Sequence, residues 1–326
     1  MLKFTASLEE NLITIQNELI HKTYKVGRYK EFYIYEPKKR LIMALPFKDR
    51  VIQWAIYKVL NPIFEKSYIY HSYACREGKG THAAAKQLQY QLKIISKKPG
   101  KWYYLKLDMA KYFYRVDHEI LLNIIERKIK DNDVLDLLSL IINSETTKFG
   151  LPLVYDDLTK VKRLDKIGIP IGNLISQMCA NIYLNELDYY VKQELGIKYH
   201  IRYMDDFIIL HNNKKYIHEI KDKIENFIGD SLNLNLNRKT TIGRTKAGIT
   251  FVGYRIWNTH TRIKKQTALR IKRSLNHLTK QYVKGKVKKD RIVAAYASYM
   301  GMLKHCNSYN LRKSIKRKLI KILNCG

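Results

Sequence analysis

The chain has 326 residues, 46% of them hydrophobic, and its 61 lysines and arginines against 29 acidic residues give a formal net charge of +32. This length and composition fit a folded protein of two or three lobes and exclude a chain without a core. The cysteines at positions 75, 179, 306 and 325 lack CxxC spacing, which argues against a zinc site or a disulfide framework.

So large a positive charge indicates a polyanionic partner, either a nucleic acid or an anionic membrane surface. Nucleic acid is favoured, because the sequence has no apolar run of transmembrane length and no clearly interfacial amphipathic stretch. The start, MLKFTASLEENLITIQNELI, lacks the long apolar run of a signal peptide. We therefore expect a cytoplasmic protein with no membrane partner.

Helical and extended segments alternate along the first half of the chain. Asp49 and Asp117 each precede an apolar pattern of helical period and are placed to act as N-caps. The expected elements are a helix at 7–22, a strand at 29–35, a turn at 36–40, extended structure at 41–46, helices at 49–64 and 80–96, a strand at 103–108, and helices at 118–129 and 133–143.

The second half begins with an irregular or hairpin-like segment at 147–170. The elements expected after it are a long helix at 176–195, a β-hairpin at 201–210, a helix at 214–229 and a strand at 251–256 preceded by a turn. Residues 264–326 look helical and contain 18 lysines and arginines and one acid, Asp290. A charge run is often only a solvated face, but one this lopsided repels itself unless a polyanion lies against it. We interpret this segment as a helical lobe that follows a nucleic-acid backbone.

Two adjacent aspartates, Asp205 and Asp206, lie between apolar runs in the stretch IRYMDDFIIL (201–210). The simplest interpretation is a hairpin turn, in which aspartate is common. The alternative is a metal site, because bound cations relieve the repulsion between desolvated carboxylates. Asp108, at the end of an apolar strand, supplies a third carboxylate. The pattern therefore predicts a site for two hard divalent ions, Mg²⁺ above all, in phosphoryl transfer.

Together, the strand ending in Asp108 and the YMDD sequence resemble the reverse transcriptases. Seven sequence blocks resemble those of the family, in the same order and over about 215 residues. These are KRLIMALPFKDRVIQWA (39–55), SYACREGKGTHAA (72–84), YLKLDMAKYF (104–113), GIPIGNLISQMCANIYLNELD (168–188), YMDD (203–206), LNLNLNRKT (232–240) and FVGY (251–254).

The resemblance implies a role for each matching residue. Asp108, Asp205 and Asp206 would be catalytic and would bind two Mg²⁺ ions, with Mn²⁺ as a substitute and the Met109 carbonyl as an extra ligand. The residues expected to meet the incoming nucleotide are Lys39, Arg40, Phe113 as a steric gate, Ile171, Gly172 and Lys239. Those expected near template or primer are Arg76, Gly78, Gly80, Tyr203, Met204, Gly253 and Tyr254.

Each of these assignments has an ordinary structural alternative. Phe113 could be core packing, Lys39 and Arg40 a solvated turn, and residues 76–80 a plain glycine turn. Ile171 could be a packing variant. For Gly78 and Gly80 the functional interpretation is that the backbone approaches the template closely, which a side chain would prevent.

The fourth block indicates a subfamily. Its Ile171-Gly172 followed by Ser176-Gln177, in the pattern IGNLxSQ, resembles the reverse transcriptases of diversity-generating retroelements, within the group II intron-like bacterial lineage. That resemblance implies adenine-mutagenised cDNA copied from a template-repeat RNA, in a bacterial or phage-infected cell. A branched apolar Ile171 would make fewer polar contacts with the incoming nucleotide and so lower discrimination. The implied partners are a structured RNA, a primer, deoxynucleoside triphosphates and a basic, oligomeric accessory variability determinant protein.

We therefore expect an α+β fold of the right-hand polymerase type, with an antiparallel sheet packed on helices. Fingers would comprise 1–99 and 118–176, the palm 100–117 and 177–261, and a basic helical thumb 262–326. The expected function is RNA-directed DNA synthesis in mutagenic retrohoming. The alternatives are another bacterial reverse transcriptase, group II intron-like or host-defence, or a non-enzymatic RNA-binding relative.

Overall fold

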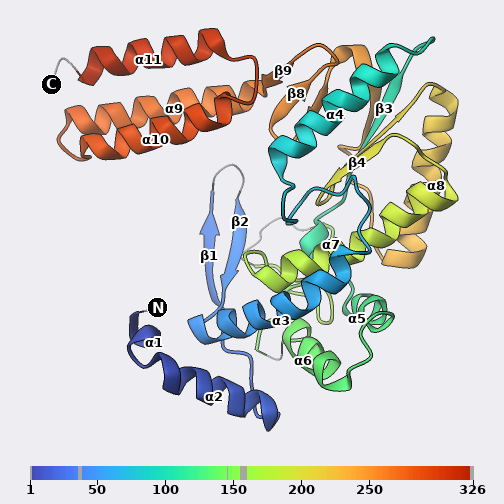
Figure 1. Cartoon of the computed structure of the whole chain (residues 1–326), viewed down its shortest axis with the longest axis vertical. Coiled ribbons are helices and arrows are strands. Elements are labelled where there is room, and N and C mark those ends of the chain that lie inside the picture. Colours follow the sequence, from blue (N-terminus) through green and yellow to red (C-terminus); the bar gives the residue numbers. More distant parts are fainter. Residues whose placement is uncertain (1, 36–38, 145, 155–159, 324–326) are drawn as a thin grey trace.

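The computed structural model describes residues 2–35, 39–144, 146–154 and 160–323, shown in Figure 1. Its α-helices are α1 (Leu2–Ala6), α2 (Leu8–Ile20), α3 (Phe47–Glu65), α4 (Thr81–Ser96), α5 (His118–Glu126), α6 (Asn132–Ile142), α7 (Leu174–Tyr189), α8 (Lys214–Leu232), α9 (Lys265–Val283), α10 (Lys289–Leu303) and α11 (Tyr309–Leu323). Its strands are β1 (Lys30–Ile34), β2 (Arg40–Ala44), β3 (Tyr103–Asp108), β4 (His200–Tyr203), β5 (Asp206–His211), β6 (Thr241–Arg244), β7 (Ile249–Phe251), β8 (Tyr254–Ile256) and β9 (Thr261–Ile263). No helix in these ranges is long and apolar enough to cross a membrane.

Every pairing among these strands is antiparallel. The sheets have the orders β1-β2, β4-β5-β3-β6 and β7-β8-β9. The predicted α+β class, with antiparallel sheets packed on helices, is confirmed. The division into fingers, palm and thumb at the stated boundaries stays a prediction.

The central sheet is buried on both faces because its strand residues alternate between two cores. Phe207 and Ile209 of β5 belong to the core that contains α7 and α8. Their neighbours Ile208 and Leu210 belong to a second core with α4 and the β7-β8-β9 sheet. This alternation of period two explains why the second half of the hairpin reads as a continuous apolar run.

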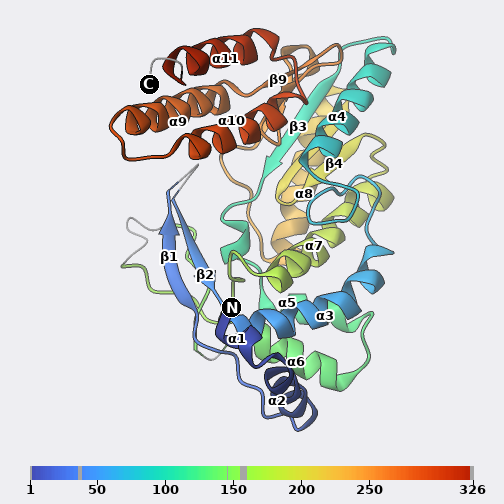
Figure 2. The ribbon, with the colours of Figure 1, turned by 60° about the vertical axis from the view of Figure 1, so that its left-hand side comes forward.

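The basic helices α9, α10 and α11 pack around a small core of their own, which includes Ile271, Ile292 and Leu303. Figures 1 and 2 show these helices at one end of the molecule, with α2, α5 and α6 at the other. Tyr254 of β8 joins this helical lobe to the rest of the fold, since its hydroxyl lies 3.2 Å from the Met302 carbonyl oxygen and 3.2 Å from Nδ1 of His82.

Several expected elements need correction. Asp49 does not cap α3, which begins at Phe47. It lies buried in the first turn and accepts hydrogen bonds from the Tyr24 hydroxyl at 2.5 Å and the Gly27 amide at 3.1 Å. The FVGY segment is not one strand, because Val252 and Gly253 form a turn with positive φ between β7 and β8. Most of the turn expected at 36–40 lies outside the described residues.

A buried ion pair joins helix α7 to the β4–β5 hairpin. The Arg202 guanidinium donates to both carboxylate oxygens of Asp188 at 2.6–3.0 Å, and neither side chain is exposed to solvent. Its remaining nitrogen donates to the Asn181 side chain at 3.2 Å and to the Met204 carbonyl at 3.3 Å. The pair therefore connects α7 directly to the turn of the hairpin.

Replacing Arg202 with methionine should lower the free energy of unfolding by about 3–5 kcal/mol, because Asp188 is left charged and buried without a partner. Lys221→Met, which removes an exposed pair with Glu225 on α8, should cost less than about 1 kcal/mol. Urea denaturation of both variants measures the difference. Equal, small losses in the two variants would contradict the anchoring role of Arg202.

Candidate active site

The β4–β5 hairpin turns on two residues, Met204 and Asp205. Tyr203 pairs with Asp206 across the ladder, and Met204 takes a left-handed conformation with φ of +55°. Such a φ is uncommon for a side chain of this size and needs support from its surroundings. The hydrogen bond from Arg202 to the Met204 carbonyl provides part of that support.

Asp108 lies directly opposite Asp206, because β3 and β5 are antiparallel neighbours in this register. The chain after Asp108 is fixed by the loop that follows α8. The Asn237 amide donates to the Asp108 carbonyl at 2.7 Å, and the Ala110 amide donates to the Asn235 carbonyl at 2.8 Å. Asp108 and the adjacent pair Asp205 and Asp206, 97 residues further along the chain, thus lie at one end of the sheet.

Lys106 supplies a positive charge beside these carboxylates. It lies two residues before Asp108 on β3 and therefore on the same face of the sheet. Its ammonium is 2.8 Å and 3.0 Å from the two carboxylate oxygens of Asp206, and it donates to the Thr250 carbonyl at 2.8 Å. Lys106 thus ties Asp206 to β7.

The pKa of Asp206 is raised to about 6. Burial is the largest cause, and the negative charges of Asp205 and Asp108 raise it further, while Lys106 opposes them. An interaction of this kind requires the three carboxyl groups to lie close together. Asp108 and Asp205 thus lie near Asp206, with Lys106 beside it, and the use of the three aspartates as a metal site stays a prediction.

Within the described ranges, no group of three or more His, Cys, Asp and Glu side chains is arranged to hold a metal ion. The donor chemistry nevertheless fits Mg²⁺, which prefers a few carboxylate oxygens. In this structure the Asp206 carboxylate contacts the ammonium of Lys106, the cation that lies beside the three aspartates. Met109 and Leu236 form an isolated antiparallel β-bridge. Its two hydrogen bonds are those of the residues on either side, so the Met109 carbonyl takes no part in them.

Three of the residues expected at the nucleotide meet at one junction. The Ile169 amide donates to the Phe113 carbonyl at 2.7 Å, and the Met43 amide of β2 donates to the Ile171 carbonyl at 3.3 Å. Gly172 follows with φ of +114°. Phe113 is partly buried and packs against the main core.

The three basic residues expected at the nucleotide are exposed. Arg40 begins β2, and the Lys39 ammonium lies 4.9 Å from the centre of the Tyr33 ring. Lys239 lies in the turn just after Asn237, which bonds to Asp108. All three are available for ligand contacts, and their roles stay predictions.

The glycine turn at 76–80 is built around Arg76, whose guanidinium is inside the protein. It is 7% exposed, pairs with Glu65 at 2.7–2.8 Å and donates to two carbonyls of its own loop at 2.7 and 2.8 Å. Its charge therefore serves the loop rather than a bound phosphate. Gly78 and Gly80 have positive φ, and no atom lies near the place where a Cβ would stand. The space beside them is open, and close approach of a template backbone there stays a prediction.

The residues expected near the primer differ in exposure. Tyr203 and Met204 are half-buried beside the carboxylates. Tyr254 is 2% exposed and its hydroxyl holds the helical lobe, so its side chain is buried, and its contact with a primer stays a prediction. The neighbouring turn at Gly253 has open space around it, and its primer contact stays a prediction.

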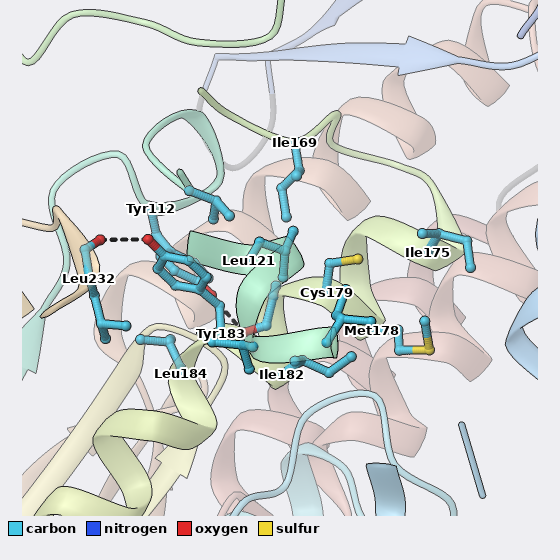
Figure 3. Packing of buried hydrophobic residues seen from close by; sticks show 14 of the residues in the cluster. Tyr112, Leu121, Ile169, Ile175, Met178, Cys179, Ile182, Tyr183, Leu184 and Leu232 are labelled. Atoms are coloured by element: carbon cyan, nitrogen blue, oxygen red, sulfur yellow. Dashed lines mark hydrogen bonds between the residues drawn. The ribbon is translucent and has the colours of Figure 1, made fainter. Parts of the chain in front are cut away.

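Residues of helix α7, among them Met178, Cys179 and Tyr183, pack in a buried cluster with Tyr112 and Leu232, as Figure 3 shows. The Tyr112 hydroxyl donates to the Ala180 carbonyl at 2.6 Å, and the Tyr183 hydroxyl donates to the Leu232 carbonyl at 2.6 Å. These bonds connect the turn after β3 and the end of α8 to the same helix. Phe113, the residue after Tyr112, is therefore held at a fixed place relative to Asp108.

A match to a family model covers residues 28–256, and that family is described as reverse transcriptase (RNA-dependent DNA polymerase). Protein YkfC of Escherichia coli is 26% identical over 287 residues, which cover 77% of this chain and 72% of that protein. The group II intron-encoded protein LtrA of Lactococcus lactis is 28% identical over 224 residues, covering 67% of this chain and 35% of LtrA.

Among solved structures, telomerase from Candida tropicalis in complex with a TWJ fragment of telomeric RNA matches 96% of this chain and 60% of its own, with a TM-score of 0.52 and 14% identity. This likeness concerns the fold alone. The chain thus spans about a third of LtrA and three fifths of the telomerase chain. The family model matches well over half of the sequence, and the matched region contains Asp108 and Asp206, which lie opposite each other in the sheet. The chain therefore belongs to the reverse transcriptase (RNA-dependent DNA polymerase) family.

Proposed function

We propose that this chain copies RNA into DNA from deoxynucleoside triphosphates, using Asp108, Asp205 and Asp206 as its catalytic residues. The observation that carries the proposal is the register of β3 and β5, which sets Asp108 opposite Asp206 beside a turn that contains Asp205. A non-enzymatic RNA-binding protein would gain nothing from three carboxylates gathered at one place, since they repel phosphate.

Two Mg²⁺ ions would be held by the three aspartates and the Met109 carbonyl, and Mn²⁺ could replace them. When bound, the ions would activate a primer 3′-hydroxyl and stabilise the leaving pyrophosphate. Lys106 would keep Asp206 in place before the ions arrive and would balance part of the negative charge. Arg40, Lys39 and Lys239 would contact the triphosphate.

Structured template RNA and its primer are the proposed macromolecular ligands. The lobe of α9, α10 and α11 would bind their backbones, because the segment 264–326 carries 18 lysines and arginines. The RNA in the telomerase complex offers a precedent within the same fold.

Two subtypes remain as proposals. The IGNLISQ stretch (171–177) favours a diversity-generating retroelement enzyme, which would work with a basic accessory protein and make errors at template adenines. The similarity to LtrA favours a group II intron-like enzyme equally well. For the diversity-generating type, a branched Ile171 beside the nucleotide would relax base discrimination.

Primer extension on a heteropolymeric RNA, with Mg²⁺ and four deoxynucleotides, tests the main proposal. Wild-type protein should make cDNA, and Asp206→Asn should lower the rate by at least about a thousandfold, a loss of roughly 4 kcal/mol in transition-state stabilisation. Glu225→Gln, an exposed change on α8, is the matched control. Undiminished synthesis by Asp206→Asn would rule out this site.

Sequencing the cDNA separates the subtypes. Errors concentrated at template adenines, with or without an added accessory protein, would support the diversity-generating type, and Ile171→Gln should then reduce them. Uniform accuracy at all four bases would favour the group II intron-like type.

Mg²⁺ should raise the melting temperature at pH 8 and much less at pH 5. The pKa of Asp206 is raised to about 6, so this group stabilises the metal-free fold most below pH 4, and that stability is lost as pH rises through 6. Mg²⁺ binding needs the ionised form and has the opposite dependence. Mg²⁺ at a hundred times its Kd should add about 2.7 kcal/mol to the free energy of unfolding, which raises the melting temperature by several degrees. Equal Mg²⁺ shifts at both pH values, or an unchanged shift in Asp206→Asn, would contradict the proposed site.

Phe113→Val should let the enzyme incorporate ribonucleotides, because the smaller side chain no longer clashes with a 2′-hydroxyl. A gain of about tenfold or more in the ribo-to-deoxynucleotide ratio is expected, corresponding to about 1.4 kcal/mol. Phe113→Tyr keeps the ring and should keep the selectivity. If Phe113→Val only loses stability and its selectivity stays unchanged, the ring is part of the core and not a gate.

A further inference from the structure

A groove lies between the end of α2 and helix α6. Figures 1 and 2 show these two helices at the end of the molecule opposite to α9, α10 and α11. Its volume is about 500 Å³. The apolar part of its lining comes from both helices and comprises Leu19, Ile20, Val134, Leu137 and Leu140. This volume is in the range of pockets that bind ligands or side chains of a partner.

The apolar surface continues beyond the groove along α2. Ile13 and Ile20 lie two helical turns apart on one face, and they are 50% and 63% exposed. Ile15 is the one residue of α2 described as buried. A helix with this much apolar exposure is typical of a surface that another protein covers.

The rim of the groove is acidic in an otherwise basic protein. Asp131, Asp133 and Asp136 line it together with Lys22, and so does Glu18, which pairs with Lys48 outside the lining. The side chains of Asp133 and Asp136 are 74% and 72% exposed, and Lys22 lies between them at 2.5 and 3.7 Å. Helices α2 and α6 together contain no lysine or arginine, although the whole chain has 61.

Charge and polarity together select the kind of occupant. A nucleic acid is disfavoured, because its phosphates would be repelled by the acidic rim. A segment that fits has apolar side chains for the floor and lysines or arginines for the rim. An amphipathic basic helix presents both, with its apolar residues at i, i+3, i+4 and i+7.

We propose that the groove between α2 and α6 is a docking site for a basic amphipathic helix of a partner protein. This inference goes beyond the proposed polymerase function and does not depend on it. The site lies far from the lobe proposed to bind nucleic acid, so both ligands could be bound at once. The acidic rim would also orient the partner, because its basic face must lie toward Asp133 and Asp136.

Fluorescence anisotropy with the full chain tests the proposal. The probe is a labelled peptide of leucines and lysines spaced to form an amphipathic helix, and its control is a scrambled peptide of the same composition. The wild-type chain should bind the amphipathic probe about tenfold more tightly than the scrambled one, since only the former offers an apolar face to the floor.

Ile20→Glu is the decisive variant, because Ile20 is exposed and the change adds negative charge. Docking through the floor predicts that binding weakens by about tenfold, whereas simple charge attraction predicts that it strengthens. The double variant Asp133→Lys with Asp136→Lys should also lose binding. Asp222→Lys with Glu225→Lys, a matched exposed pair on α8, should bind like the wild type.

The proposal is overturned if Ile20→Glu binds the probe as well as the wild type or if the scrambled peptide binds equally. It is also overturned if sedimentation shows that the chain self-associates and that Ile20→Glu abolishes this, because the occupant is then a second copy. Primer extension by Ile20→Glu should match the wild type, so a failure here is distinct from a failure of the polymerase proposal.

Discussion

The buried ion pair between Asp188 and Arg202 is the constraint on which the candidate active site depends. Neither side chain touches solvent, and their bidentate contact fixes the hairpin strand β4 against helix α7. The same guanidinium holds the carbonyl of Met204, the residue whose left-handed conformation makes the turn. Since α7 also accepts a hydrogen bond from Tyr112, one helix sets the positions of both the hairpin and the segment that follows Asp108. Separate parts of the sequence are thereby brought to one place.

A second consequence is electrostatic. Three carboxylates gathered at the end of a sheet destabilise a fold unless cations balance them. Lys106 partly fills this need in the protein alone, and it does so from the same strand that carries Asp108. Its link to the Thr250 carbonyl also ties the carboxylates to the small sheet that leads to the basic helical lobe. The fold thus separates an acidic cluster of Asp108, Asp205 and Asp206, a basic lobe and an acidic outer groove.

Much of this arrangement could be predicted from the sequence. The strand ending in Asp108, the hairpin containing Asp205 and the cap at Asp117 follow from local patterns, and all three occur in the structure. Lys106 was not predicted, although its spacing of two from Asp108 on a strand was a usable signal. Arg202 could not be paired with Asp188 from sequence, because that contact depends on how a helix crosses a sheet. Asp49 was misassigned as a cap because its real partners, Tyr24 and Gly27, lie more than twenty residues away.

The central claim is that Asp108, Asp205 and Asp206 form one metal-binding catalytic centre. The most direct measurement is a crystal structure with Mn²⁺, an RNA–DNA primer–template and a non-reactive deoxynucleotide, with the ions located by anomalous scattering. The account predicts two anomalous peaks against these carboxylates, with Asp206 turned from Lys106 toward the metal. Ordered nucleotide and primer with Mn²⁺ peaks elsewhere would contradict it.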